Sequence, residues 1–101
     1  MSLIGIDMGS RSVKIAAYHE DGNLLAVVNH SISPLHPHPG WWETDPRDVW
    51  QATTKGLQEL MQMDVLKKDA PRALAISASG RENFPMDADG NPLANNIMGA
   101  D

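Results

Sequence analysis

The sequence predicts an α/β domain in the order β-β-β-α-β followed by a β-hairpin, and three observations lead to this expectation. A tight-turn signal at Asp21-Gly22 separates strand-like segments in the first third of the chain. A helix start at Asp45-Pro46 opens a stretch with apolar residues at helical spacing. A short apolar run follows at 73–78. Elements in this order indicate an α/β domain whose sheet begins with a meander.

The first three strands are expected at residues 3–7, 13–19 and 24–33. The apolar run of the first segment stops at Asp7, as in a buried strand that delivers a carboxylate to its C-terminal end. The second segment alternates roughly between apolar and polar residues, and Glu-Asp-Gly-Asn separates it from the third. Because Asp-Gly supplies the positive φ angles that a tight hairpin needs, these segments are predicted to form a β-meander.

The helix is expected to run from Pro46 to about Met63. Asp45 can cap the first free N–H groups, and proline suits the first helical position. One apolar face is predicted from helical spacing: Val49, Trp50, Thr53, Leu57, Leu60 and Met61. The run at 73–78 is expected to be a strand parallel to an earlier one. A second hairpin-type turn at 88–91 precedes a short strand at 97–98.

Length, charge and composition limit the classes of function. With 101 residues, the chain is expected to form one domain or less. The net charge of −5 and the absence of a basic cluster argue against a nucleic-acid partner. The sequence has no cysteine, and no apolar run approaches the roughly 18 residues of a membrane span. We therefore expect a cytoplasmic protein without a membrane partner.

The turn after the first strand is the strongest candidate for chemistry. Gly9 lets the backbone approach a phosphate, and the hydroxyl groups of Ser10 and Ser12 add donors. Asp7 can supply an oxygen ligand to Mg²⁺, and Lys14 a positive charge. On the residues alone, an ordinary hairpin with a solvated aspartate explains the pattern equally well.

A proline-rich loop carries His36 and His38, with Glu43 nearby. Two histidines do not complete a metal site, although the alternating prolines hold the loop extended. The simpler expectation is a loop that Trp41 or Trp42 pins against the core.

Two further polar segments follow the fourth strand. Residues 81–83 read Arg-Glu-Asn and lie where open α/β sheets bind ligands, so they suit either polyol hydroxyl groups or a surface turn. Residues 87–91 contain two aspartates, a glycine and an asparagine, but the bidentate glutamate of a calcium loop does not follow. A structural hairpin turn is therefore expected there.

Taken together, these segments resemble the N-terminus of the FGGY family of carbohydrate kinases, in the actin-like ATPase superfamily. The matching pieces are residues 5–14, residues 38–46 with Trp50, residues 76–80, and residues 87–93 leading to Asp101. The order Pro-Gly-Trp-x-Glu-x-Asp-Pro at 39–46 is the most specific of them. The resemblance implies an incomplete ribonuclease-H-like fold and transfer of the ATP γ-phosphate to a sugar or polyol hydroxyl.

The resemblance also implies roles for individual residues. It places Asp7 at the position linked to Mg²⁺, through water. It implies that the ATP phosphates contact Gly9, Ser10, Arg11, Ser12 and Lys14. The sugar or polyol would contact Arg81, Glu82 and Asp101. Gly99 stands where the family has a tryptophan that walls the substrate, so the sequence departs from the pattern there.

In the family, the catalytic base and the adenine-binding residues lie in a later segment. Residues 1–101 are therefore expected to be the N-terminal part of the first kinase domain, inactive alone, and either to pair with another copy or to need the rest of the chain. Three other classes remain open: an ATP-driven dehydratase activator, a non-catalytic actin-like or chaperone-type ATPase module, and a standalone interaction domain. An activator needs cluster-binding cysteines, and the Pro-Gly-Trp segment argues against the ATPase module.

Overall fold

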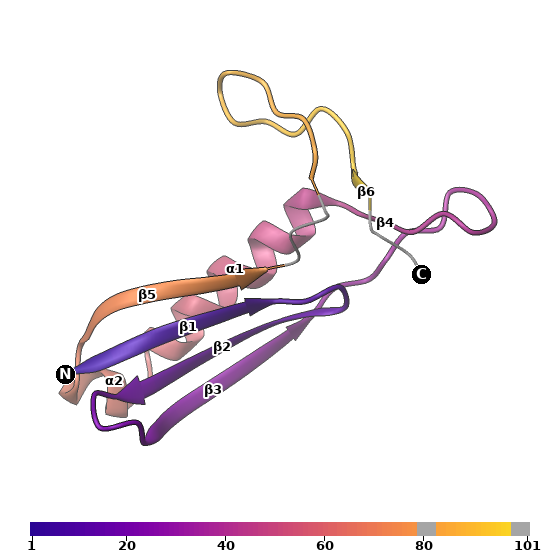
Figure 1. The fold of residues 1–101 in the computed structure, drawn as a ribbon. Helices are drawn as coiled ribbons and strands as arrows, with labels where there is room; N and C mark the ends of the chain where they lie inside the picture. Colours follow the sequence, from indigo (N-terminus) through magenta and orange to yellow (C-terminus); the bar gives the residue numbers. More distant parts are fainter. Residues whose placement is uncertain (79–82, 98–101) are drawn as a thin grey trace.

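The computed structural model describes residues 1–78 and 83–97, which are built around a four-stranded sheet (Figure 1). The first three strands, β1 (Ser2–Met8), β2 (Ser12–His19) and β3 (Leu24–Ser31), form an antiparallel meander. Strand β5 (Pro71–Ala78) pairs with β1 in parallel, so that the order across the sheet is β3-β2-β1-β5. The predicted order and the parallel fourth strand are confirmed, although the third strand ends two residues earlier than expected.

The turn between β2 and β3 forms as the Asp-Gly signal predicts. Gly22 has a φ of 97°, in the left-handed region that favours glycine. The His19 N–H donates to the Asn23 carbonyl at 2.8 Å, and the Asp21 carboxylate accepts from the Asn23 backbone and side chain. These bonds hold the hairpin closed, and the Asn23 N–H above all lowers the pKa of Asp21.

Helix α1 (Pro46–Met61) starts where the sequence places it, with the Arg47 N–H donating to Asp45 Oδ1 at 2.9 Å. It ends slightly earlier than predicted, and a second helix, α2 (Asp64–Lys68), follows that the sequence analysis missed. Its signal was an acidic residue in the first turn and Lys67 in the last turn, which suit the helix dipole. In the described part of the chain, neither helix is long and apolar enough to cross a membrane.

The core lies between α1 and one face of the sheet. Its buried side chains come from β1, β2, β3, the segment after β3 and both helices: Ile4, Ile6, Val13, Ile15, Ala17, Val28, Ile32, Ala52, Leu60 and Leu66. Helix and sheet approach closely at Gly56, where an added Cβ would lie 2.7 Å from Ile15 Cδ1. The absence of a side chain at Gly56 therefore sets how near α1 sits to β2.

The predicted apolar face of α1 is wrong for two of its members. Trp50 is 69% exposed and Met61 is 42% exposed, whereas Thr53 and Leu60 are buried. Trp50 is six residues from Gly56 and Met61 is five residues from it. At about 100° per residue, their side chains lie roughly 120° and 140° around the helix from the face that meets the sheet.

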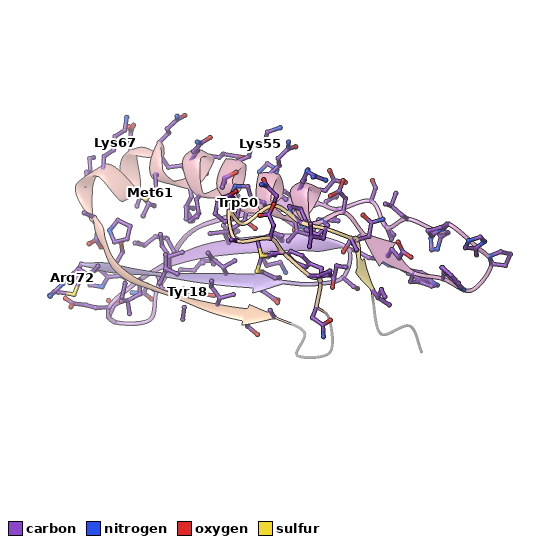
Figure 2. All side chains as sticks on the ribbon, turned by 90° about the horizontal axis from the view of Figure 1, so that it is seen from above. Tyr18, Trp50, Lys55, Met61, Lys67 and Arg72 are labelled. Atoms are coloured by element: carbon purple, nitrogen blue, oxygen red, sulfur yellow. The ribbon has the colours of Figure 1, made fainter. Side chains whose placement is uncertain are left out.

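The opposite face of the sheet has no helix over it among the described residues. In Figure 2, Lys55 and Lys67 point away from the sheet on the helix side, while Tyr18 lies on the other face. Leu74 and Ile76 share the helix-side face with the core strands, because they are in register with buried residues of β1. They are nevertheless more than half exposed, since β5 is at the edge and α1 packs mainly on β2 and β3.

The C-terminal part contains the predicted hairpin turn. The Asp87 N–H donates to the Asn91 carbonyl, and the Asp87 carboxylate accepts from the Asn91 backbone and side chain. These bonds, the Asn91 N–H first among them, lower the pKa of Asp87, which confirms the structural interpretation of this turn. A short strand, β6 (Asn96–Ile97), pairs with β4 (Glu43–Thr44), and Ile97 also forms an isolated antiparallel bridge with Asn83. This pairing was not predicted, and residue 98 of the expected strand lies outside the described residues.

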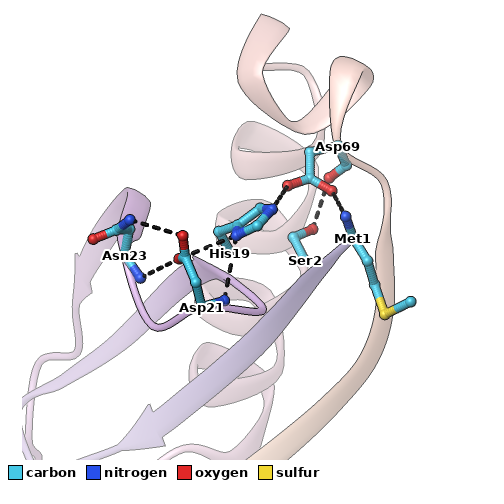
Figure 3. A network of polar contacts seen from close by, with 6 residues as sticks. All are labelled: Met1, Ser2, His19, Asp21, Asn23 and Asp69. Atoms are coloured by element: carbon cyan, nitrogen blue, oxygen red, sulfur yellow. Dashed lines mark hydrogen bonds and ion pairs between the residues drawn. The ribbon is translucent and has the colours of Figure 1, made fainter.

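A polar network closes the end of the sheet where β1 begins (Figure 3). It comprises Met1, Ser2, His19, Asp21, Asn23 and Asp69. The Asp69 carboxylate is its centre, because it forms an ion pair with the Met1 amine and lies 3.8 Å from His19 Nε2. The hydrogen bond to Asp69 raises the pKa of that amine. The network ties β1 and β2 to the segment that leads into β5.

Candidate phosphate-binding site

The turn from β1 to β2 is closed by one backbone hydrogen bond. The Gly9 N–H donates to the Ser12 carbonyl at 2.9 Å, and Ser10 and Arg11 are exposed at the tip. A Cβ added to Gly9 would lie 3.3 Å from the Ser12 carbonyl oxygen, which is a tight contact with backbone. The turn therefore favours glycine at this position and leaves its tip open to a ligand.

Asp7 and Lys14 lie beside this turn on the face of the sheet away from α1. The two residues are register partners across β1 and β2, and Ser77 of β5 is the partner of Asp7 on the other side. The Asp7 side chain is exposed and has no hydrogen bond or ion pair within residues 1–78 and 83–97. Its oxygen atoms are thus available to a hard cation or to water, next to the phosphate turn.

The turn is also held from the segment that follows β3. The N–H of buried Ile32 donates to the Arg11 carbonyl at 2.8 Å. The Arg11 guanidinium carbon lies 5.7 Å from the centroid of the Trp42 ring, within the range of a cation–π contact. This link could not be predicted from the sequence, because the two residues are 31 positions apart and no local pattern connects them.

The proline-rich loop does not pack as the sequence analysis expected. Trp41 is 54% exposed and meets the His38 ring at 4.4 Å, and Trp42 meets the His36 ring edge-on at 4.6 Å. Neither tryptophan belongs to the core cluster. The expectation that one of them pins the loop to the core is therefore wrong, because each ring packs on a histidine of the loop itself.

A cavity of about 610 Å³ lies beside the turn, on the helix side of the sheet. The turn residues Met8 and Ser10 contribute to its wall, together with Trp50 of α1 and with Phe84 and Met86 of the hairpin segment. Its lining is mainly apolar. Exposed Trp50 thus lines this cavity, and α1 and the hairpin segment both border it together with the phosphate turn.

The structure brings together all the residues predicted to contact the phosphates and the metal: Asp7, Gly9, Ser10, Arg11, Ser12 and Lys14. They lie at the carboxyl end of β1 and the start of β2. The three residues predicted to contact the substrate lie outside the described residues: Arg81, Glu82 and Asp101. Among the described residues, no group of three His, Cys, Asp or Glu side chains could hold a metal ion. Any cation at Asp7 would therefore depend on water and a ligand for most of its coordination.

Residues 2–101 match the N-terminal domain of the FGGY family of carbohydrate kinases. The chain belongs to this family. A xylulose kinase from Staphylococcus epidermidis is 30% identical over 96 residues, which are 95% of this chain and 19% of the relative. A glycerol kinase from Symbiobacterium thermophilum is 28% identical over 97 residues, or 95% of this chain and 20% of the relative. The chain thus spans about a fifth of the length of these FGGY kinases.

Solved structures confirm the predicted fold. A xylulose kinase from Rhodospirillum rubrum superposes with a TM-score of 0.89 at 25% identity, covering 96% of this chain and 20% of that one. A glycerol kinase from Plasmodium falciparum, solved with ADP, gives 0.87 at 25% identity over 95% of this chain and 20% of that one. The α/β arrangement described above is therefore that of the N-terminal domain of FGGY kinases, with the actin-like ATPase fold.

Proposed function

We propose that the protein phosphorylates a hydroxyl group of a sugar or polyol with ATP, and that this chain supplies the phosphate-binding half of the site. The observation that carries the proposal is an exposed turn with a closely packed glycine at the carboxyl end of β1, in a chain that belongs to a family of carbohydrate kinases. The relatives named glycerol kinase and xylulose kinase support a polyol or sugar as substrate. The similar structure solved with ADP supports a nucleotide as the phosphate carrier.

The proposed phosphate contacts follow from the chemistry of the turn. Ser10 is exposed and Ser12 is half-buried, and their N–H and hydroxyl groups can donate to phosphate oxygens, while Arg11 and Lys14 add positive charge. Phosphoryl transfer depends on positioning and on stabilising charge at the phosphate oxygens. Donors fixed between two strands serve both needs, because the sheet holds them in place before the ligand binds.

We propose Mg²⁺ as the metal, bound through water by Asp7. The Asp7 carboxylate fits this role, because it is exposed at the strand end and has no side-chain partner within the described ranges. Mg²⁺ keeps several water ligands and is held by one or two carboxylates plus substrate phosphates. When bound, the ion would neutralise charge on the phosphates. Asp7 itself would orient the water that links the protein to the ion.

The substrate side of the proposal concerns Arg81, Glu82 and Asp101. We propose that they bind the hydroxyl groups of the sugar or polyol. Since the FGGY relatives are about five times longer, we also propose that residues 1–101 do not catalyse phosphoryl transfer alone. A purified chain that phosphorylates glycerol or xylulose above background would overturn that part. A cytoplasmic location, without membrane or nucleic-acid partners, completes the proposal.

The exposed edge of the sheet supports a further proposal about partners. Leu74 and Ile76 are exposed on β5, which pairs only with β1 in the described part. An apolar edge strand is a ready template for pairing with another strand. We propose that this edge is covered either by a second copy or by the rest of a longer chain. Sedimentation that shows a stable monomer of residues 1–101, with no concentration dependence, would contradict it.

Titration with Mg²⁺–ADP, followed by ¹⁵N NMR, tests the phosphate site in the chain itself. Gly9→Ala should weaken binding by about tenfold, because the added Cβ crowds the Ser12 carbonyl oxygen and displaces the turn tip from its ligand, with a loss comparable to that of one strong hydrogen bond to a charged group. Gly5→Ala is the matched control, because a Cβ there meets no atom within 4 Å, and it should bind as the wild type does. Equal affinity of both variants, or no chemical-shift change around residues 7–14, would refute the proposed site.

A further inference from the structure

We infer that Trp42 positions the Arg11 side chain at the phosphate turn, so that the proline-rich loop forms a second wall of the phosphate site. The inference rests on the proposed function and names a positioning residue for it. Its basis is the contact between the Arg11 guanidinium and the Trp42 ring, 5.7 Å from carbon to centroid. Trp42 does not touch a ligand in this scheme and acts only through Arg11.

Arg11 needs an external support because the turn itself offers its side chain none. The backbone of Arg11 is fixed, since its carbonyl accepts from the Ile32 N–H. Its side chain is exposed and makes no ion pair within residues 1–78 and 83–97. A long side chain of this kind loses rotamer freedom when it binds a ligand, which weakens binding. The flat face of Trp42 restricts that freedom beforehand.

The Trp42 ring is in turn held within its loop. His36 meets the ring edge-on at 4.6 Å, with the two planes at 90°. Because a carbonyl oxygen only accepts, the His36 Nδ1–H donates to the Trp41 carbonyl, at 3.0 Å. The base of the loop is closed by reciprocal backbone bonds between Leu35 and Glu43, at 2.6 and 2.9 Å. Packing and hydrogen bonds within the loop thus hold the Trp42 ring in the place where it contacts Arg11.

The neighbouring tryptophan provides a contrast within the same loop. Trp41 packs on His38, is more exposed, and makes no cation–π contact with Arg11 in the part of the chain that the structure describes. Substituting Trp41 therefore changes the loop by the same number of atoms without touching the proposed support. If the loop mattered only for folding or for general apolar surface, the two tryptophans would be equivalent.

The test compares Mg²⁺–ADP affinity of the 101-residue chain and its variants by ¹⁵N NMR titration. Trp42→Leu should weaken binding about 2- to 5-fold, the range that an exposed cation–π contact supports. Trp42→Phe, which keeps an aromatic face, should recover most of the affinity, and Trp41→Leu should leave it unchanged. With Arg11→Gln already present, Trp42→Leu should have no further effect.

A spectroscopic readout separates positioning from a structural role. The ring current of Trp42 should shift the Arg11 side-chain protons upfield in the wild type and in Trp41→Leu, and this shift should vanish in Trp42→Leu. The inference is overturned if the shift is absent, if Trp42→Leu binds normally, or if its loss of affinity is as large without Arg11 as with it. A wild type that does not bind Mg²⁺–ADP would overturn the proposed phosphate site in this chain, and this inference with it.

Discussion

Gly56→Ala tests how closely helix α1 must approach the sheet. In an exposed helix, this change stabilises by up to about 1 kcal/mol, because alanine is the better helix former. Here the new Cβ would lie 2.7 Å from Ile15 Cδ1, roughly 1 Å inside the usual contact distance between carbon atoms. Ile15 is fully buried, so its terminal methyl group cannot turn toward solvent. Overpacking of this kind costs about 1–3 kcal/mol.

The two effects have opposite signs, and the steric one should prevail. The net expectation is a loss of about 1 kcal/mol in the free energy of unfolding, with a range of about 0–2 kcal/mol. For a chain of this length, such a loss lowers the melting temperature by roughly 4–8 °C. Urea unfolding followed by circular dichroism measures it, with an unchanged slope showing that only stability changed.

A double-mutant cycle assigns the loss to the contact between Gly56 and Ile15. Ile15→Val removes the clashing methyl group and costs about 0.5–1.5 kcal/mol by itself. Beside Gly56→Ala it should cost about 1 kcal/mol less, because the cavity that it leaves accepts the new methyl group. Gly5→Ala, whose Cβ meets open space, should not destabilise. Additive effects within about 0.5 kcal/mol, or a Gly56→Ala variant that is more stable than wild type, would refute the packing argument.

Three further outcomes are expected. Asp45→Ala should lower the free energy of unfolding by about 1 kcal/mol, because it removes the cap of α1, while Asp45→Ser should retain most of it in the same urea assay. Asp87→Asn should destabilise the chain at pH 7, and the loss should shrink progressively as the pH falls below 3.8. The lowered pKa of Asp87 means that its contribution is present above its ordinary pKa of 3.8 and is lost as the pH falls through the folded-state value, so a loss independent of pH would contradict the assignment. Asp7→Asn should abolish the gain in ADP affinity that Mg²⁺ gives while leaving metal-free binding intact or stronger, and titrations with and without Mg²⁺ decide this.

Local signals in the sequence predicted most of the fold. Asp21-Gly22 marked the hairpin because its backbone requirement is met within two residues, and Asp45 marked the helix start for the same reason. The pairing of β4 with β6 joins two-residue strands more than 50 positions apart, and two residues carry no periodicity that could reveal it. Trp50 fits the helical spacing of apolar residues, yet this spacing cannot show which side of α1 meets the sheet, and Trp50 is exposed on another side.

The candidate site likewise has a part that could be predicted from the sequence and a part that could not. Asp7 to Lys14 are adjacent in the sequence, so their place in one turn could be predicted together with their chemistry. The support from Ile32 and the contact with Trp42 join separate segments, and only the assembled fold brings them to the turn.

Asp7 and Arg11 should respond differently to mutations elsewhere in the chain. Asp7 lies inside the sheet, bonded through its strand to β2 on one side and β5 on the other. Its position therefore depends on the core, and variants such as Gly56→Ala that strain the contact between α1 and β2 should affect it only through global stability. Arg11 lies at the tip of a turn, and its side chain depends on one aromatic ring in an exposed loop. Substitution of Trp42 should accordingly change phosphate affinity without changing the free energy of unfolding, whereas core variants should do the reverse.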